Sequence, residues 1–116
     1  MLRFALYMNM YSQLGLKCGE GSVGDCVMKP ERVPLSAVVR DIACGDYHNL
    51  ALTSNNEVYS WGFGEMYALG HGKDKDELYP KKLNFDNSKE VGRIKVTQVS
   101  GGGQHSAIIG RVFSTA

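Results

Sequence analysis

The segment from Ile42 to Gly72 constrains the fold of this chain more than any other part of the sequence. It reads IACGDYHNLALTSNNEVYSWGFGEMYALGHG, in which glycines and two short β-prone runs follow one another closely. Glycine supplies the positive φ angles and the close backbone approach that tight turns between short strands require. The segment therefore predicts a small β unit bounded by obligatory turns.

Parts of this segment recur on either side of it. The Leu-Gly pair at 69–70 has an earlier copy at 14–15. The Gly-x-x-His motif that begins at Gly45 has a later copy that begins at Gly102. The two spacings are nearly equal, and a period a little above fifty is typical of propellers and repeat arrays. We expect the chain to consist of copies of one unit.

The pattern within the unit is all β. Polar and apolar residues alternate in short runs that are rich in β-branched and aromatic side chains, and no segment shows sustained helical periodicity. The Ser-Asn-Asn-Glu stretch at 54–57 is a turn, because Asn tolerates the left-handed region. The predicted strands are 49–53, 58–61, 81–83, 94–99 and 106–109.

Several apolar side chains of the unit are predicted to form its core. Leu50, Leu52, Trp61 and Leu69 belong to this set, and Trp61 is expected to fill space between adjacent sheets. Cys44, in an apolar stretch, is expected to be a small buried hydrophobic residue. The glycines at 62, 64, 70 and 72 are interpreted as backbone devices, because Gly-Phe-Gly lacks the third glycine and the helix of a dinucleotide-binding motif.

Composition excludes several functional classes. The 116 residues suffice for one domain, and 13 basic against 12 acidic residues give a net charge of +1 and no global attraction for nucleic acid. The three cysteines lack the spacing of a disulfide framework, which favours a reducing compartment over a secreted disulfide scaffold. No cysteine lies close to a second cysteine or a histidine in the way that a zinc site requires, so no metal site is predicted. We predict no cofactor and no membrane-spanning or signal segment.

The motifs together resemble the repeat of the regulator of chromosome condensation family. The resemblance rests on C-G-x-x-H-x-L-A-L-T from Cys44, V-Y-S-W-G-x-G from Val58 and L-G-x-G from Leu69, and it covers roughly Met10 to Ile109. There are departures: Leu-Tyr-Met at 6–8 stands where a repeat carries Trp-Gly, and Tyr67-Ala68 replaces the common Gly-Gln.

The resemblance implies a fold and a division of the chain. These repeats build a seven-bladed β-propeller, of which this chain would supply about two blades. Residues 1–35 would be the end of an upstream repeat with its connecting loop, 36–98 a complete repeat, and 99–116 the start of the closing repeat with a divergent tail. We expect a C-terminal fragment or a truncated gene product. Because blades bury their faces against neighbours, it should be marginally stable or prone to self-association alone.

The resemblance also implies a function. Residues 67–76 and 99–105 are similar to the last repeats of the family's chromatin-bound guanine-nucleotide exchange factor for the small GTPase Ran. Exchange needs no covalent chemistry, so we predict a nuclear binding protein, not an enzyme, and no exchange activity from this piece alone. Carried over by position, the residues that contact the GTPase would be Asp46, His48, Gln104 and His105.

Nucleosomal DNA is the second partner that the resemblance implies. Lys89, Arg93 and Lys95 could make phosphate contacts, and histones are a possible further partner through the complete propeller. The alternation of charge at 73–77 is interpreted as a solvent-exposed loop.

Competing interpretations stay open at this point. Recurring histidines are often structural, Asp46 is also a common turn former, and three basic residues often form an ordinary solvated surface. The chain is alternatively an interaction module of another family member, of ubiquitin-ligase, ciliary or signalling type, without Ran exchange activity. A hydrolase on a β-sandwich would require a base–nucleophile pair that the sequence does not show.

Overall fold

The structure, a computed structural model, describes residues 4–8, 26–84 and 93–113. The described part is all β, with a single 3-10 turn, η1 (Glu65–Tyr67). The strands are β1 (Phe4–Met8), β2 (Cys26–Arg32), β3 (Val39–Cys44), β4 (His48–Thr53), β5 (Val58–Gly62), β6 (Glu77–Lys82), β7 (Arg93–Gly101) and β8 (Ser106–Phe113).

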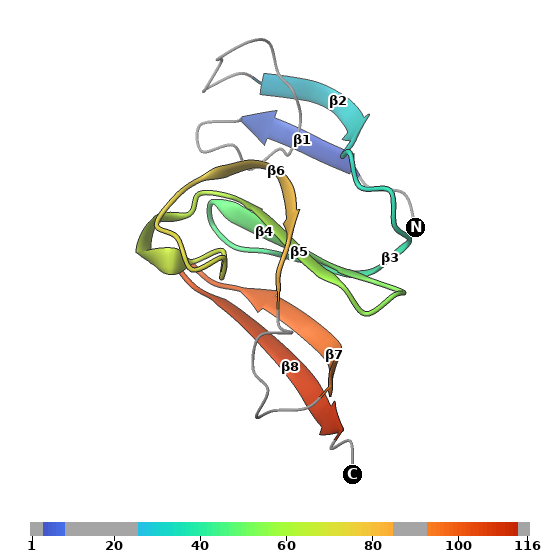
Figure 1. The fold of residues 1–116 in the computed structure, drawn as a ribbon. Helices are drawn as coiled ribbons and strands as arrows, with labels where there is room; N and C mark the ends of the chain where they lie inside the picture. Colours follow the sequence, from blue (N-terminus) through green and yellow to red (C-terminus); the bar gives the residue numbers. More distant parts are fainter. Residues whose placement is uncertain (1–3, 9–25, 85–92, 114–116) are drawn as a thin grey trace.

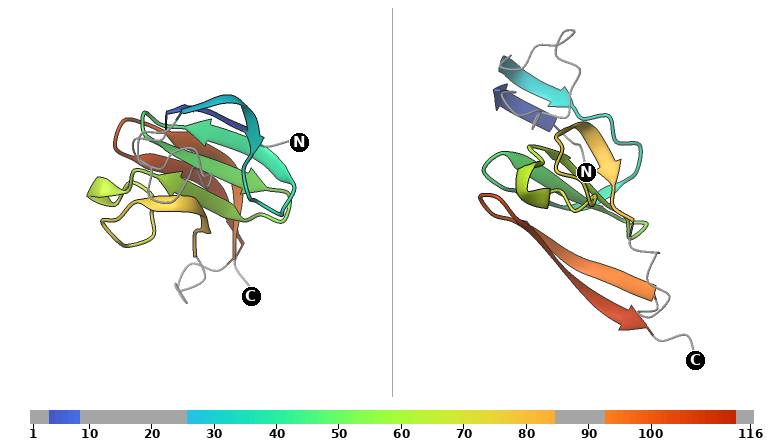
Figure 2. Two further views of the ribbon diagram at one scale, coloured as in Figure 1. Left: turned by 90° about the horizontal axis from the view of Figure 1, so that it is seen from above. Right: turned by 60° about the vertical axis from the view of Figure 1, so that its left-hand side comes forward.

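The strands form three antiparallel sheets that follow one another along the molecule (Figure 1). The first is the hairpin β1–β2, the second is the four-stranded sheet β3-β4-β5-β6, and the third is the hairpin β7–β8. Figure 2 shows, in its right-hand view, that the two hairpins lie on opposite sides of the four-stranded sheet. The described chain thus contains one complete sheet between two half sheets.

The β7–β8 hairpin repeats the β3–β4 half of the four-stranded sheet. In β3–β4 the pairing runs from Val39↔Thr53 to Cys44↔Asn49, with a register shift at position 40. In β7–β8 the pairing starts at Arg93↔Phe113, and its part from Val96↔Gly110 to Gly101↔Ser106, with a register shift at position 97, matches β3–β4. All of these positions, the bulge included, are related by one constant offset, which is the spacing of the two Gly-x-x-His motifs. The period predicted from those motifs is therefore a structural repeat.

The β1–β2 hairpin repeats the β5–β6 half of the four-stranded sheet. Phe4 pairs with Arg32, as Tyr59 pairs with Lys82, and both pairings are followed by a register shift two positions further on. The offset from β1 to β5 equals the spacing predicted from the Leu-Gly pairs. Of the two Leu-Gly sequence pairs, the one at 14–15 lies outside the described residues.

A hydrophobic core lies on each face of the four-stranded sheet. The inter-sheet core lies between the four-stranded sheet and β7–β8, and it consists of Leu50, Leu52, Val58, Leu83, Val96 and Val99. The Trp61 core lies on the opposite face, under the segment that leads from β2 into β3, and it consists of Val33, Leu35, Val39, Ala51 and Trp61. All four predicted core residues are buried.

Polar side chains also join the four-stranded sheet to β7. Asn56, held at φ 64, donates from Nδ2 to the carbonyl of Ile94 at 2.9 Å and accepts the Val96 N–H at 2.7 Å. The Arg40 guanidinium donates to the carbonyl of Val96 at 2.8 Å. Asn56 thereby acts toward β7 as the backbone of a neighbouring strand would, and it satisfies edge groups that would otherwise be unpaired.

Each predicted strand overlaps an observed one, but the structure contains three further strands and its outer strand begins earlier than predicted. Strands β1, β2 and β3 were not predicted, and the outer strand begins at Glu77, not at 81. The prediction that Cys44 is buried was wrong. Cys44 is an exposed free thiol at the end of β3, because side chains alternate between the two faces of the strand and Cys44 falls on the same exposed face as Ile42. The loop at 73–77 is exposed for the most part, as predicted.

Candidate interaction rim

Three loops gather at one end of the sheets, and we call them together the loop rim: residues 45–47, 63–76 and 102–105. Backbone groups tie them together. The Asp46 N–H donates to the Gly102 carbonyl at 3.2 Å, and the Phe63 N–H donates to the Tyr47 carbonyl at 2.9 Å. The rim is thus a continuous surface built from two neighbouring sheets.

The two Gly-x-x-His motifs have the same geometry. The Gly45 N–H donates to the His48 carbonyl at 2.8 Å, and the Gly102 N–H donates to the His105 carbonyl at 2.9 Å. In each motif the imidazole packs against the glycine so closely that a Cβ there would collide with the ring. Glycine is therefore required by close approach, and the motif is a device for closing a tight hairpin over its own histidine.

His48 is buried, with 1 % of its surface exposed, and it bridges two sheets. Its Nε2 lies 2.8 Å from the Ser106 hydroxyl, which in turn donates to the Ala68 carbonyl at 2.7 Å. The serine hydroxyl thus has the Ala68 carbonyl as the acceptor for its proton, and the direction of its contact with Nε2 depends on the imidazole tautomer. Desolvation lowers the pKa of His48, partly offset by hydrogen bonding to the backbone of His105.

A second Ser–His pair has the same arrangement. The Ser60 hydroxyl donates to the Leu69 carbonyl at 2.7 Å and lies 2.9 Å from His71 Nε2. Burial also lowers the pKa of His71. In both pairs the serine proton is directed at a backbone carbonyl, whereas a general base must accept the serine proton, so neither contact has the arrangement of an activated nucleophile.

The candidate GTPase-binding residues divide into one buried and three exposed side chains. Asp46, Gln104 and His105 are exposed on the rim, and the Asp46 carboxylate faces Gly103, where a Cβ would lie 3.5 Å from it. His48 is buried below them and presents no surface to a partner. The structure thus brings all four into one region, with the two loops in direct contact.

The candidate DNA-binding residues lie on or before β7. Lys89 is outside the described residues, Arg93 begins β7, and Lys95 is exposed on it. Arg111 on β8 is directly opposite Lys95 and is also exposed, which the sequence analysis did not identify. The pairing of β7 with β8 was the missing information, because only the strand register brings these two residues together.

The rim also contains three exposed apolar residues that the sequence analysis did not place there, Tyr47, Met66 and Tyr67. Met66 and Tyr67 are non-glycine residues at φ 57 and φ 58. The loop is held from its far side by carboxylates, since Asp74 accepts the Met66 N–H and Asp76 accepts the Gly64 N–H, both at 2.8 Å. The signal in the sequence was Tyr67 itself, which stands where the repeat carries Gly.

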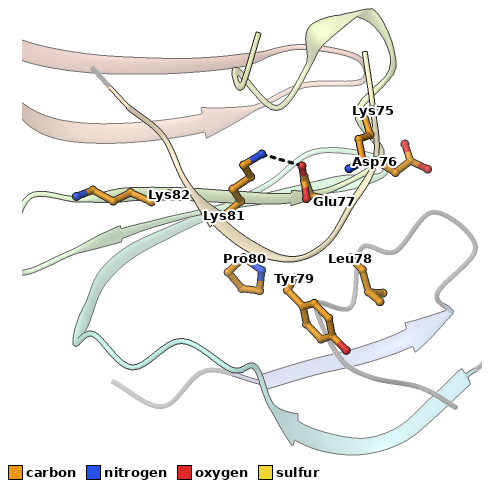
Figure 3. Close-up of a pocket in the computed structure, with 8 residues that line it drawn as sticks. All are labelled: Lys75, Asp76, Glu77, Leu78, Tyr79, Pro80, Lys81 and Lys82. Carbon is orange, nitrogen blue, oxygen red and sulfur yellow. Dashed lines mark hydrogen bonds and ion pairs between the residues drawn. The ribbon is translucent and has the colours of Figure 1, made fainter. Parts of the chain in front are cut away.

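An open pocket of about 620 Å³ borders the rim at Lys75 and Asp76. It is lined by one stretch, 75–82, whose Glu77–Lys81 ion pair spans 3.2 Å. Figure 3 shows Leu78 and Tyr79 of this stretch on the side of the β1–β2 hairpin. Within the described ranges no group of three or more His, Cys, Asp or Glu residues is placed to hold a metal ion. No helix in that part of the chain is long and apolar enough to span a membrane.

Several proteins are similar in sequence to parts of this chain. Human protein RCC2 is 41 % identical over 75 residues, which cover 53 % of this chain and 14 % of RCC2. The human E3 ubiquitin-protein ligase HERC2 is 56 % identical over 45 residues, covering 39 % of this chain and 1 % of HERC2. Protein RCC1 of Candida albicans is 33 % identical over 113 residues, covering 89 % and 24 %. The chain thus spans a quarter or less of these relatives.

Solved structures of similar proteins identify the fold. Human WBSCR16 superposes with a TM-score of 0.75 at 30 % identity, over 92 % of this chain and 26 % of that one. Prp20p of Saccharomyces cerevisiae, studied for its binding to Gsp1p and histones, superposes with a TM-score of 0.69 at 28 % identity, over 88 % and 23 %. The fold is therefore part of a β-propeller, as predicted.

The family assignment follows from sequence and structure together. The regulator of chromosome condensation (RCC1) repeat matches residues 8–52 and 55–109, and a second form of that repeat matches 39–67. These matches cover most of the chain, and their period agrees with the repeated strand register and bulges. The chain belongs to the RCC1 repeat family, and it is related to RCC1 itself and to RCC2 and HERC2.

Proposed function

We propose that the loop rim binds a small GTPase of the Ran type and that the chain acts as part of a nuclear, chromatin-associated exchange factor. The observation that carries this proposal is the placement of Asp46 beside the loop of Gln104 and His105, exposed on two sheets joined by hydrogen bonds. Similarity to RCC1 and to Prp20p supports the choice of partner.

The rim would act by binding alone. An exchange factor lowers nucleotide affinity by binding the nucleotide-free GTPase more tightly than the loaded form, so it needs no nucleophile or cofactor. In this proposal Asp46 and Gln104 contact the partner directly. His48 positions both loops from below, through Ser106 and Ala68.

Chromatin contact would come from the basic residues of the third sheet. Lys95 and Arg111 form an exposed pair across β7 and β8, and Arg93 and Lys89 precede or begin β7. Such side chains neutralise phosphates without reading base sequence, so this contact would hold the propeller on nucleosomal DNA irrespective of sequence, with histones as further contacts.

A second candidate function is supported by the identities themselves. The matched parts of RCC2 and HERC2 are more similar to this chain than the matched part of RCC1 is. On this alternative the rim binds another protein, and the chain has no activity toward Ran.

Binding of purified nucleotide-free Ran to the immobilised 116-residue chain distinguishes the two candidates. We expect binding by the wild type and about tenfold weaker binding by Asp46→Ala and by Gln104→Ala, the loss expected for one hydrogen bond to a charged or polar partner. Ser54→Ala is the matched control, because Ser54 is exposed on the turn at the opposite end of the β4–β5 hairpin.

Each outcome decides one part of the proposal. Equal binding by the wild type and both rim variants would remove the rim as the site but keep Ran as the partner. No binding by the folded wild type, checked by circular dichroism, would favour the interaction-module alternative for this chain.

A further inference from the structure

The two half sheets are complementary parts of one sheet. Hairpin β1–β2 reproduces β5–β6, and hairpin β7–β8 reproduces β3–β4, in register and in bulge position. Placed side by side in the order β7-β8-β1-β2 they would repeat the order β3-β4-β5-β6. Within one copy this cannot occur, because the four-stranded sheet lies between the two hairpins (Figure 1).

The edges left open by this arrangement are the ones that would meet. In the complete sheet β4 pairs with β3 on one side and with β5 on the other. Its copy β8 pairs only with β7 among the described strands, and β1, the copy of β5, pairs only with β2. An unpaired strand edge is a template for pairing with another chain.

Two exposed apolar residues show that faces as well as edges are complementary. Ile109 is 60 % exposed, whereas Leu52, its equivalent one period earlier, is fully buried in the inter-sheet core. Ile42 is 57 % exposed, whereas Val99, its equivalent one period later, is 5 % exposed in that same core. Ile109 and Ile42 are thus the two halves of a contact that the molecule already makes once internally.

We propose that the half sheets of two copies of this chain complete each other, with β8 of one copy pairing with β1 of the next and Ile109 packing against the face that holds Ile42. The repeat offsets fix the register. Since Leu50 pairs with Ser60, Ala107 pairs with Ala5 of the second copy. The junction is head-to-tail, and repeated junctions close into a ring when the rotation permits.

The strand count limits the ring. Among the described strands each copy contributes one complete sheet and two half sheets, so a ring closed by this junction alone has an even number of blades. Propellers have about four to eight blades, which restricts a closed assembly to two, three or four copies.

Two surface substitutions test the junction. Ile109→Lys and Ile42→Lys each place a charge on one side of it, and both sites are exposed within a copy, so each variant should fold. Light scattering with size-exclusion chromatography should give a closed assembly for the wild type and monomers for each variant. Val38→Lys is the matched control, because Val38 is 61 % exposed and its repeat equivalent, Lys95, is exposed as well.

Mixing the two monomeric variants gives the decisive result. One variant retains the Ile109 side and the other retains the Ile42 side, so one junction can form and the second would oppose two lysines. We expect a one-to-one dimer that grows no further. Non-specific association through exposed apolar surface would give no such stoichiometry, and that outcome would overturn the proposal.

A cross-link tests the register separately. With Cys18, Cys26 and Cys44 replaced by serine, Ala5→Cys with Ala107→Cys should form disulfides between copies, because opposed Cβ atoms lie about 5 Å apart. The pair Ala5→Cys with Ile108→Cys is shifted by one position and should not cross-link, because such a shift reverses the face. A wild type that stays monomeric and unfolds cooperatively at high protein concentration would also overturn the proposal.

Discussion

A single residue type has two fates in this molecule, and the difference lies in what covers it. His48 and His105 occupy the same position of the same motif, each over its own glycine. His48 is buried because the third sheet lies against it and provides Ser106. His105 is exposed, and no sheet of the described chain lies beyond it. Within the described chain the motif is therefore buried where a neighbouring sheet packs against it and exposed where no such sheet is described.

Acid should destabilise the molecule through its buried imidazoles. Burial lowers the pKa of His48 and of His71 below the ordinary value of 6.5, so the unfolded chain binds more protons than the folded one. Their contribution to stability is complete above pH 6.5 and is lost as the pH falls through that value toward the folded pKa. Urea unfolding midpoints between about pH 7.5 and pH 5.5 measure this loss.

The variant His48→Gln separates this effect from general acid sensitivity. Glutamine retains an N–H for Ser106 but does not titrate, so the fall in the midpoint with pH should be smaller than in the wild type, with His71 contributing the rest. An unchanged pH dependence in His48→Gln would show that His48 is not responsible.

Among the elements, the loop at 63–76 carries backbone strain at an exposed site. Met66 and Tyr67 both lie in the left-handed region, which costs a non-glycine residue about 1–2 kcal/mol. Neither side chain is buried, so packing does not offset this cost. Asp74 and Asp76 hold the loop in place instead. Strain of this kind at a surface is characteristic of binding sites.

Relieving the strain should stabilise the fold. Tyr67→Gly is expected to raise the free energy of unfolding by about 0.5–1 kcal/mol, because glycine adopts φ 58 freely but loses more chain entropy on folding. Tyr67→Ala removes the same ring without relieving φ and should not stabilise. Urea denaturation of both variants measures the difference. Equal stabilities of the two variants would show that the loop is not strained at this position.

The elements that could be predicted from the sequence are those with local signals. The β4–β5 hairpin was evident because alternation on both sides meets an Asn-rich turn, and Asn56 does adopt a positive φ. Strand β3 was missed, since exposed and partly buried residues alternate along it and it is defined by pairing with β4. The link from His48 to Ser106 joins residues far apart in the chain, and the pairing of Lys95 with Arg111 depends on register. Such contacts follow from the repeat only once strand register is known.

On the scale of the whole molecule, stability should vary from sheet to sheet because each sheet contacts only its neighbours. In repeat architectures stability is roughly a sum of unit and interface terms. The complete sheet has a core on each face, and its interface with β7 includes the inter-sheet core and the hydrogen bonds of Asn56 and Arg40. Toward β1–β2, Val33 and Leu35, which follow that hairpin, are the buried residues among those whose burial the structure describes.

Hydrogen exchange followed by mass spectrometry should therefore show a gradient. Amides of β4 should exchange most slowly, because β4 is central in its sheet and Leu50, Ala51 and Leu52 are all buried. Amides of β1–β2 in dilute protein should exchange fastest among the strands, since this hairpin is a two-stranded sheet at one end of the described stack and local opening is easiest at such an edge. Raising the protein concentration should slow exchange in β1 and β8, the edges proposed to pair between copies, and leave β4 unchanged, because its neighbours belong to the same copy. Equal protection of β1 and β4 in dilute protein would contradict the gradient and indicate that the three sheets open as one cooperative unit.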